Sequence, residues 1–227
     1  MNRDLFVYNE ETHIGVYNGK PIPSVTQLLD LLYPYSEDIP EERLTKAAER
    51  GTKLHNAILK LNEYFDNPFG WKHNIEVVRE VATKMAKALD LPQLIDYVIF
   101  LETYGLQPFD YEEEIFLLDE SDDPICFGHY DCTYLCQKDI AFLKEGLLVL
   151  TDYKTTSLFA KQKVALQESI YALAYEQCSK NQISGINSLW FSNEGTKLIP
   201  LELRSKENTI ALATLLRQQW EEKQKEN

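Results

Sequence analysis

Two apolar stretches, GHYDCTYLC at 128–136 and LLVLTDYKTTS at 147–157, constrain the fold of this chain most strongly. Both are rich in β-branched and aromatic residues, so both are predicted to be strands. Because side chains alternate between the two faces of a strand, Asp152 and Lys154 should point to one face and Tyr153 to the other. If the two strands pair, Asp131 can meet this Asp–Lys pair, and two carboxylates and an ammonium then converge on one sheet face.

Such a group of charges could bind a divalent cation and a phosphate. Two converging carboxylates attract a hard divalent cation such as Mg²⁺, because oxygen ligands suit it and like charges otherwise repel each other. The ammonium of Lys154 would place positive charge beside a phosphate oxygen or help to activate water. An Asp-x-Lys at a strand end is also common by chance and then marks only a solvated terminus, so the interpretation depends on residues elsewhere in the chain.

Composition narrows the class of protein. The chain has 227 residues, enough for one substantial core, and a net charge of −13, which argues against a protein that coats nucleic acid through bulk charge. A local basic cleft in an enzyme stays compatible with that charge.

No apolar run is long enough to cross a membrane and the start lacks a secretory signal, so we expect a cytoplasmic protein with no membrane partner. The four cysteines form no C-x-x-C pair, so neither a zinc site nor an iron–sulfur cluster is expected.

Hydrophobic periodicity predicts a mixed α/β fold. A hairpin at 5–20 and a helix capped by Ser24 come first, followed by helices over 40–66, 74–90 and 92–104. Three strands, over 111–118 and the two stretches above, then precede a helix over 160–180, two strands joined at Asn193-Glu194-Gly195 and a helix capped by Ser205. We expect one domain, with a mainly helical part at 1–105 packed on a core at 106–227 that carries the strands in the order β-β-β-α-β-β-α.

Two further residues are candidate partners of the carboxylates. His55 lies one helical turn after Gly51, and its imidazole is a good third ligand for a divalent metal; most lone histidines on helices are ordinary surface or core residues. Glu114 opens the strand at 111–118 and would lie near the metal if that strand neighbours the one with Asp131. Glutamates that open strands are usually solvated, so both interpretations stay open.

The helix after the Asp-x-Lys carries four more candidates. Gln167 and Tyr171 are four residues apart and share a helix face, so both could contact the backbone of a nucleic acid, or could mark the boundary between core and surface. Lys161 and Lys163 lie near the start of this helix, where anions are favoured, and could hold phosphates or simply be solvated.

Five motifs in order carry a resemblance to a known family. G-x-x-x-H, an acidic strand, G-H-Y-D, D-Y-K-T-T and Q-x-x-x-Y follow one another as in the PD-(D/E)XK nuclease superfamily. The chain looks most like the RecB-like branch, with the RecB nuclease domain and phage or RecE-type exonucleases, and PIPSVT at 21–26 is similar to the start of such domains. The match covers about residues 21–175, and it implies a restriction-endonuclease-like mixed sheet flanked by helices.

The resemblance implies a role for each matched residue. His55, Asp131 and Asp152 are similar to the family's metal ligands, with the backbone carbonyl of Tyr153 beside them, and Lys154 matches the catalytic lysine. Gln167 and Tyr171 match the pair that borders the catalytic site, whereas Glu114 is a looser match. The long connection between Asp131 and Asp152 departs from the family pattern and leaves the register of the two strands open.

These roles imply a deoxyribonuclease that depends on Mg²⁺ or Mn²⁺, expected to act as an exonuclease in phage or bacterial DNA recombination, repair or processing. The implied partners are DNA and a recombinase or single-strand-annealing protein; because ring-forming relatives exist, a homo-oligomer is compatible with the resemblance, and a phage protein would act in the host cytoplasm. Two alternatives stay open. One is a non-catalytic module that binds nucleic acid or a protein, as an inhibitor or assembly subunit, since an acidic surface can mimic DNA. The other is a restriction-type endonuclease.

Overall fold

A computed structural model describes residues 3–9, 14–34, 41–66, 75–111, 113–139, 144–192 and 194–226 of the chain. After a short 3-10 turn at Arg3–Leu5, the elements are β1 (Phe6–Asn9), β2 (Ile14–Tyr17), β3 (Lys20–Ile22), α1 (Val25–Leu32), α2 (Glu41–Asp66), α3 (Ile75–Leu89), α4 (Gln93–Tyr104), β4 (Leu106–Tyr111), β5 (Glu114–Leu118), β6 (Pro124–His129), β7 (Cys132–Cys136), β8 (Leu148–Lys154), α5 (Lys161–Ser179), β9 (Ile183–Ser192), β10 (Gly195–Leu201) and α6 (Lys206–Glu226). The predicted mixed α/β class is confirmed.

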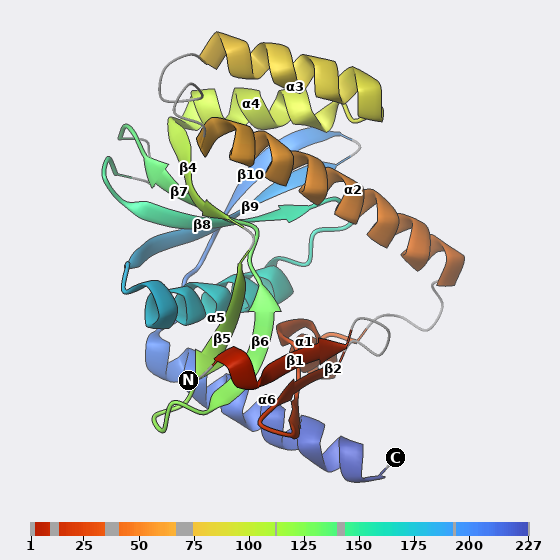
Figure 1. Ribbon diagram of the computed structural model, residues 1–227, viewed down its shortest axis with the longest axis vertical. Helices are drawn as coiled ribbons and strands as arrows, with labels where there is room; N and C mark the ends of the chain where they lie inside the picture. The colour runs from red at the N-terminus through yellow and green to blue at the C-terminus, as the bar shows by residue number, and fades with distance from the viewer. Residues whose placement is uncertain are drawn as a thin grey trace.

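A five-stranded sheet lies at the centre, in the order β10-β9-β8-β7-β4. Its β8 and β9 are parallel and joined through α5, whereas the other neighbouring pairs are antiparallel. Helices α2, α3 and α4 cover one face of this sheet, α5 covers the other, and α6 lies beyond α5 (Figure 1). Among the described helices, none is long and apolar enough to cross a membrane.

β8 is the strand on which both cores meet. Its residues from Val149 to Tyr153 are all buried, as expected of a strand covered on both faces. Val149 belongs to the core beneath α2, α3 and α4, and the next residue, Leu150, belongs to the core beneath α5 and α6. Both side chains are fully buried, so the position of β8 between the helix layers is fixed from both sides.

The predicted single strand at 128–136 is wrong, because the chain breaks there into β6 and β7. In an unbroken strand Tyr130 and Cys132 would share a face, but Tyr130 packs in the core on the α5 side and Cys132 in the core on the α2 side. The regular alternation of side chains between the two faces is therefore interrupted at Asp131. The facing strand breaks at the same level, since β4 ends with the pair Tyr111↔Cys132 and β5 begins with Glu114↔His129.

Five strands, β4 to β8, precede α5 where the order β-β-β-α-β-β-α predicted three. The other predicted elements are largely present. Ser24 caps α1 with a full capping box, in which its hydroxyl accepts from the Gln27 amide and the Gln27 side chain accepts from the Ser24 amide. The N-terminal hairpin carries a third strand, β3, reached through Asn18 and Gly19, which both have positive φ. Asn193, Pro40 and part of the predicted connection between β7 and β8 (140–143) lie outside the described residues.

A chain of buried hydroxyl groups joins β8 to the helical layer. The Tyr153 hydroxyl is hydrogen-bonded to that of Tyr134, which lies 2.8 Å from the Tyr97 hydroxyl. Tyr97 in turn donates to Asn62 Oδ1 on α2 at 2.6 Å. All four side chains are buried, so these bonds satisfy polar groups that would otherwise destabilise the core.

The position of each tyrosine in this chain predicts its contribution to stability. Tyr153→Phe removes one hydrogen bond and leaves Tyr134 with Tyr97 as partner, so the free energy of unfolding should fall by about 1 kcal/mol. Tyr97→Phe removes two and leaves the buried Asn62 oxygen without its donor, so the loss should be about 2 kcal/mol or more. Urea denaturation of both variants measures the difference. Equal losses of unfolding free energy would contradict the proposed order of the hydrogen-bonded side chains.

Candidate functional site

The candidate site forms where β8 extends beyond its neighbour β7. The pairing between these strands ends at Cys132↔Thr151, so the backbone of Tyr153 has no strand partner on that side. Two side chains take its place. The Tyr153 amide donates to Asp131 Oδ2 at 2.6 Å, and the Tyr153 carbonyl oxygen lies 3.0 Å from His55 Nε2.

His55 and Asp131 also contact each other directly, with Nδ1 of the imidazole 3.0 Å from Oδ1 of the carboxylate. Both ring nitrogens therefore face acceptors, an arrangement that only the doubly protonated imidazolium satisfies. Burial alone would lower the pKa of His55, but the charge and hydrogen bond of Asp131 outweigh burial and raise that pKa to about 9. Burial would raise the pKa of Asp131, and His55 holds it below its usual range.

Helix α2 can approach β8 closely because of Gly51. An added Cβ at this position would lie 3.3 Å from the Thr155 hydroxyl, which is tighter than an ordinary contact. His55 follows one turn later on the same helix face, so this close approach helps to bring the imidazole to Tyr153 and Asp131.

Asp152 and Lys154 lie on the same face of β8 and form an ion pair of 2.8 Å. The Lys154 ammonium also donates to Gln167 Oε1 at 3.1 Å, and the Gln167 amide donates to the Tyr171 hydroxyl at 3.2 Å. Burial, opposed by Lys154 and reinforced by the charge of Asp131, raises the pKa of Asp152 to about 6. Burial would lower the pKa of Lys154, but Asp152 outweighs it and raises that pKa, so the lysine stays cationic.

The structure therefore brings His55, Asp131, the Tyr153 carbonyl and the pair Asp152–Lys154 to one end of the sheet. Tyr171 joins this group because residue 128 on β6 is a glycine. An added Cβ at Gly128 would lie 2.6 Å from the Tyr171 ring, which is closer than real Cβ contacts. The glycine of G-H-Y-D thus makes room for the tyrosine of Q-x-x-x-Y.

Glu168 is a buried acid that the sequence analysis did not single out. It is fully buried on α5, and both of its carboxylate oxygens lack a hydrogen-bond partner, as does Oδ2 of Asp152. Burial, followed by the charge of Asp152, raises the pKa of Glu168 well above its usual range. A signal was present in the sequence: the positions three, four and seven residues further on are Tyr171, Ala172 and Tyr175, which marks position 168 as part of an apolar helix face.

Three of the predicted candidates lie apart from this group. Glu114 pairs across the β5–β6 ribbon with His129. Burial raises the pKa of Glu114, and the charges of His129 and Arg3 only partly oppose this effect. The Lys163 ammonium binds Asp30 of α1 at 2.8 Å, so this lysine is held by α1 and does not join the group. Lys161 is exposed in the first turn of α5.

The donor set fits a hard divalent cation in its chemistry. Two carboxylates, a carbonyl and an imidazole lie together, and the unpartnered oxygens of Asp152 and Glu168 are buried groups of the kind that a cation satisfies. Among the side chains that the structure describes, no three of His, Cys, Asp and Glu are arranged around a common point as metal ligands. The contacts explain why: His55 binds Asp131 and Tyr153, and Asp152 binds Lys154.

The raised pKa of His55 predicts a pH-dependent contribution to stability. Because the folded-state pKa of about 9 exceeds the ordinary value of 6.5, the charged pair stabilises the fold fully below pH 6.5 and loses this effect as pH rises through 9. In EDTA, the difference in unfolding free energy between wild type and His55→Asn should shrink by about 1–3 kcal/mol from pH 7 to pH 10.

Urea denaturation at several pH values measures this difference. Replacement of the exposed His129 by Asn is the control for the loss of a histidine outside this contact. A difference between wild type and the His55 variant that stays constant with pH would contradict the ion pair.

Comparison with known proteins adds little to this geometry. No family model matches the chain, and no curated protein matches it. One solved structure, described as the crystal structure of SSO0001, is similar at 12% sequence identity and a TM-score of 0.36, over 84% of this chain and 81% of that one. A likeness this weak carries no argument about fold family or function.

Proposed function

We propose that the chain is a divalent-metal-dependent nuclease that hydrolyses phosphodiester bonds of DNA, with a restriction-endonuclease-like core of the PD-(D/E)XK type. One observation carries the proposal: an imidazole, two aspartates and a lysine lie in one connected group, beside buried acid oxygens that lack a partner. Buried carboxylates with strongly raised pKa values, such as those of Asp152 and Glu168, are typical of catalytic sites.

His55, Asp131, Asp152 and the Tyr153 carbonyl are the groups that would hold Mg²⁺ or Mn²⁺. A bound divalent cation supplies a Lewis acid that polarises the phosphate and lowers the pKa of a water ligand. The Asp131 carboxylate already receives the Tyr153 amide, so its position relative to that carbonyl is set by the backbone of β8.

Lys154 acts in this proposal as a fixed positive charge. Its ammonium is held between Asp152 and Gln167, and its raised pKa makes it a poor base at neutral pH. Such a charge stabilises the extra negative charge that develops on a phosphate during hydrolysis. Gln167 is a positioning residue, since it links the lysine to the Tyr171 hydroxyl.

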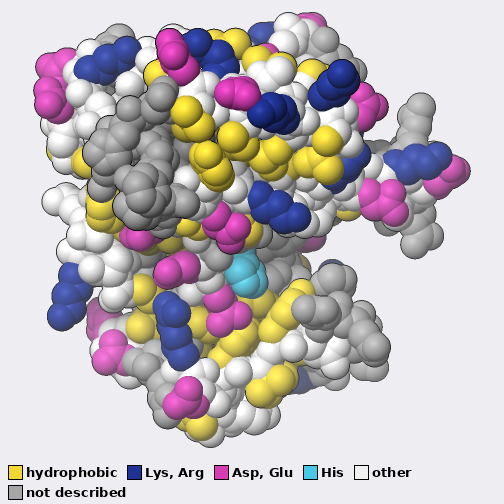
Figure 2. Space-filling model, turned by 45° about the horizontal axis from the view of Figure 1, so that its top comes forward, with side chains coloured by type: hydrophobic (Ala, Val, Ile, Leu, Met, Phe, Trp, Pro, Cys, Tyr) yellow, Lys and Arg dark blue, Asp and Glu magenta, His cyan; other side chains and the backbone are white. Residues whose placement is uncertain are grey.

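The face shown in Figure 2 is not the uniformly acidic surface that a DNA mimic would present. A mimic needs negative charge gathered on one surface. On the face shown in Figure 2, acidic and basic side chains are interspersed, and acidic side chains flank a histidine.

Removal of the charge of Asp152 or of Lys154 should strongly slow cleavage. We expect Asp152→Asn and Lys154→Ala each to lower the cleavage rate of linear DNA in Mg²⁺ by about 10²-fold or more. Lys84→Ala, at an exposed lysine of α3, is the matched control and should cleave at the wild-type rate.

The same assay on circular DNA separates the proposed exonuclease, which needs an end, from an endonuclease. Undiminished cleavage by both β8 variants would remove the proposed mechanism. Folded wild-type protein without activity on any linear or circular substrate would favour the non-catalytic module.

Metal binding should release a proton from His55. Because its pKa is about 9, the imidazole is protonated at pH 7.5 and must lose a proton before it can bind a metal. Titration calorimetry with Mn²⁺ in buffers of different ionisation enthalpy should therefore report release of about one proton per metal bound. His55→Gln should bind more weakly and release about one proton fewer than wild type. Tight binding by wild type without proton release would exclude His55 as a ligand.

A further inference from the structure

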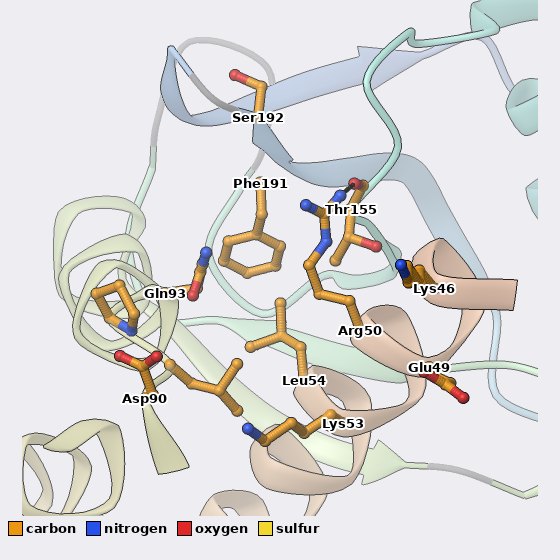
Figure 3. Close-up of a pocket in the computed structure, with 12 residues that line it drawn as sticks. Lys46, Glu49, Arg50, Lys53, Leu54, Asp90, Gln93, Thr155, Phe191 and Ser192 are labelled. Carbon is orange, nitrogen blue, oxygen red and sulfur yellow. Dashed lines mark hydrogen bonds between the residues drawn. The ribbon is translucent and has the colours of Figure 1, made fainter. Parts of the chain in front are cut away.

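A pocket with several charged lining residues lies beside the candidate site, because Thr155, which directly follows Lys154, is part of its lining. It has a volume of about 510 Å³, within the range of small-ligand pockets. Its wall is formed by α2, the α3–α4 connection and the ends of β8 and β9 (Figure 3). The lining includes Lys46, Arg50, Lys53, Leu54, Gln93 and Phe191.

The cations of this wall come from one face of α2. Positions 46, 50 and 53 are spaced by four and three residues, so their side chains line up along the helix. Arg50 donates to the Thr155 carbonyl at 2.7 Å and Lys53 to the Leu89 carbonyl at 2.6 Å. Both partners are neutral, so within the described residues neither charge is balanced by an ion pair.

Acidic residues contribute less to the wall. Glu49 and Asp90 also line the pocket, but in Figure 3 the Glu49 side chain points away from the group formed by Arg50, Leu54 and Phe191. Lys46 is ion-paired with Glu42 at 2.6 Å, so Arg50 and Lys53 are the cations of this wall that have only neutral partners among the described residues. An exposed guanidinium and an exposed ammonium are groups that bind phosphate.

The remaining lining is suited to an unpaired base. Leu54, Leu91 and Phe191 are buried side chains whose edges form an apolar floor of the pocket, against which a base can pack only when it is not paired. Gln93 lies beside the Phe191 ring, and its buried Oε1 has no hydrogen-bond donor. Rotation of this amide would offer the acceptor to an N–H group of a base.

The pocket is also placed along the path of a strand that reaches the candidate site. Thr155, which Arg50 holds, directly follows Lys154. Arg50 and His55 are five residues apart on α2, about 7.5 Å along the helix axis, so the two side chains leave adjacent turns of one helix.

We propose that this pocket is a nucleotide subsite, which binds one unpaired nucleotide next to the scissile phosphate and makes single-stranded nucleic acid the preferred substrate. Arg50 and Lys53 bind the phosphate, and the base lies on the apolar floor beside Gln93. This inference rests on the proposed nuclease function and adds the substrate class.

Binding of a labelled single-stranded oligodeoxynucleotide to the full chain in EDTA tests the subsite without cleavage. In Arg50→Gln an amide donor for the Thr155 carbonyl remains but the charge is lost, so a merely structural role would leave binding unchanged. Arg50→Gln and Lys53→Gln should each lower the slope of log affinity against log salt by about 0.7, the loss of one phosphate contact to a single strand. The decrease in affinity from 50 to 200 mM salt then becomes about 2.5-fold smaller. Lys84→Gln is the control and should keep the wild-type slope.

The base is tested by two further probes. Abasic nucleotides in the oligonucleotide should weaken wild-type binding by about fivefold or more, and a duplex of the same sequence should bind more weakly than the single strand.

Salt slopes of the Arg50 and Lys53 variants that equal the control, or tighter binding of the duplex, would overturn the subsite. Cleavage by wild type together with unchanged slopes would refute the subsite alone, whereas neither cleavage nor binding by wild type would refute the nuclease as well.

Discussion

The site depends on the way in which the unpaired end of β8 is satisfied. A strand that extends beyond its neighbour exposes an amide and a carbonyl that must find other partners. Here Asp131 accepts the Tyr153 amide and His55 contacts the Tyr153 carbonyl, while the two side chains also form an ion pair with each other. The backbone of β8 thus fixes an imidazole and a carboxylate relative to Asp152 and Lys154, which leave the same strand on one face.

These charges are held together in the protein interior, where burial raises the free energy of each charged group. The cationic His55 and Lys154 each face an aspartate, and the two pairs limit that effect. Glu168 has no such partner, and its raised pKa means that it takes up a proton more readily than an exposed glutamate. Because these groups interact, the loss of one charge alters the pKa values of the others.

The sequence was most informative where its patterns were local. The Ser24 cap, α5 and the shared face of Asp152 and Lys154 follow from periodicity and capping, and the order of the motifs indicated that His55 and Asp131 would join them. Features that depend on tertiary packing were missed or wrong. The break at Asp131 arises because Tyr130 and Cys132 enter different cores, which alternation along a strand cannot reveal.

Side-chain partners from distant segments were equally hard to foresee. Lys163 meets Asp30 across 133 positions, so a lysine expected near phosphates instead anchors α5 to α1. Glu168 was overlooked because a glutamate within a polar stretch of helix looks solvated unless the face it shares with Tyr171 is considered. The basic face of α2 has regular spacing in the sequence, but only the structure shows that Arg50 reaches the end of β8.

The contact between His55 and Tyr153 joins residues 98 positions apart in the chain. During synthesis from the N-terminus, α2 emerges well before β8, so its imidazole has no acceptors until the central sheet has formed. Contacts of such long range are slow to form, because the intervening chain must be ordered first. We therefore expect the charged group to assemble late in folding, and transient undocking of α2 from the sheet would dismantle it while β8 itself stayed paired with β9.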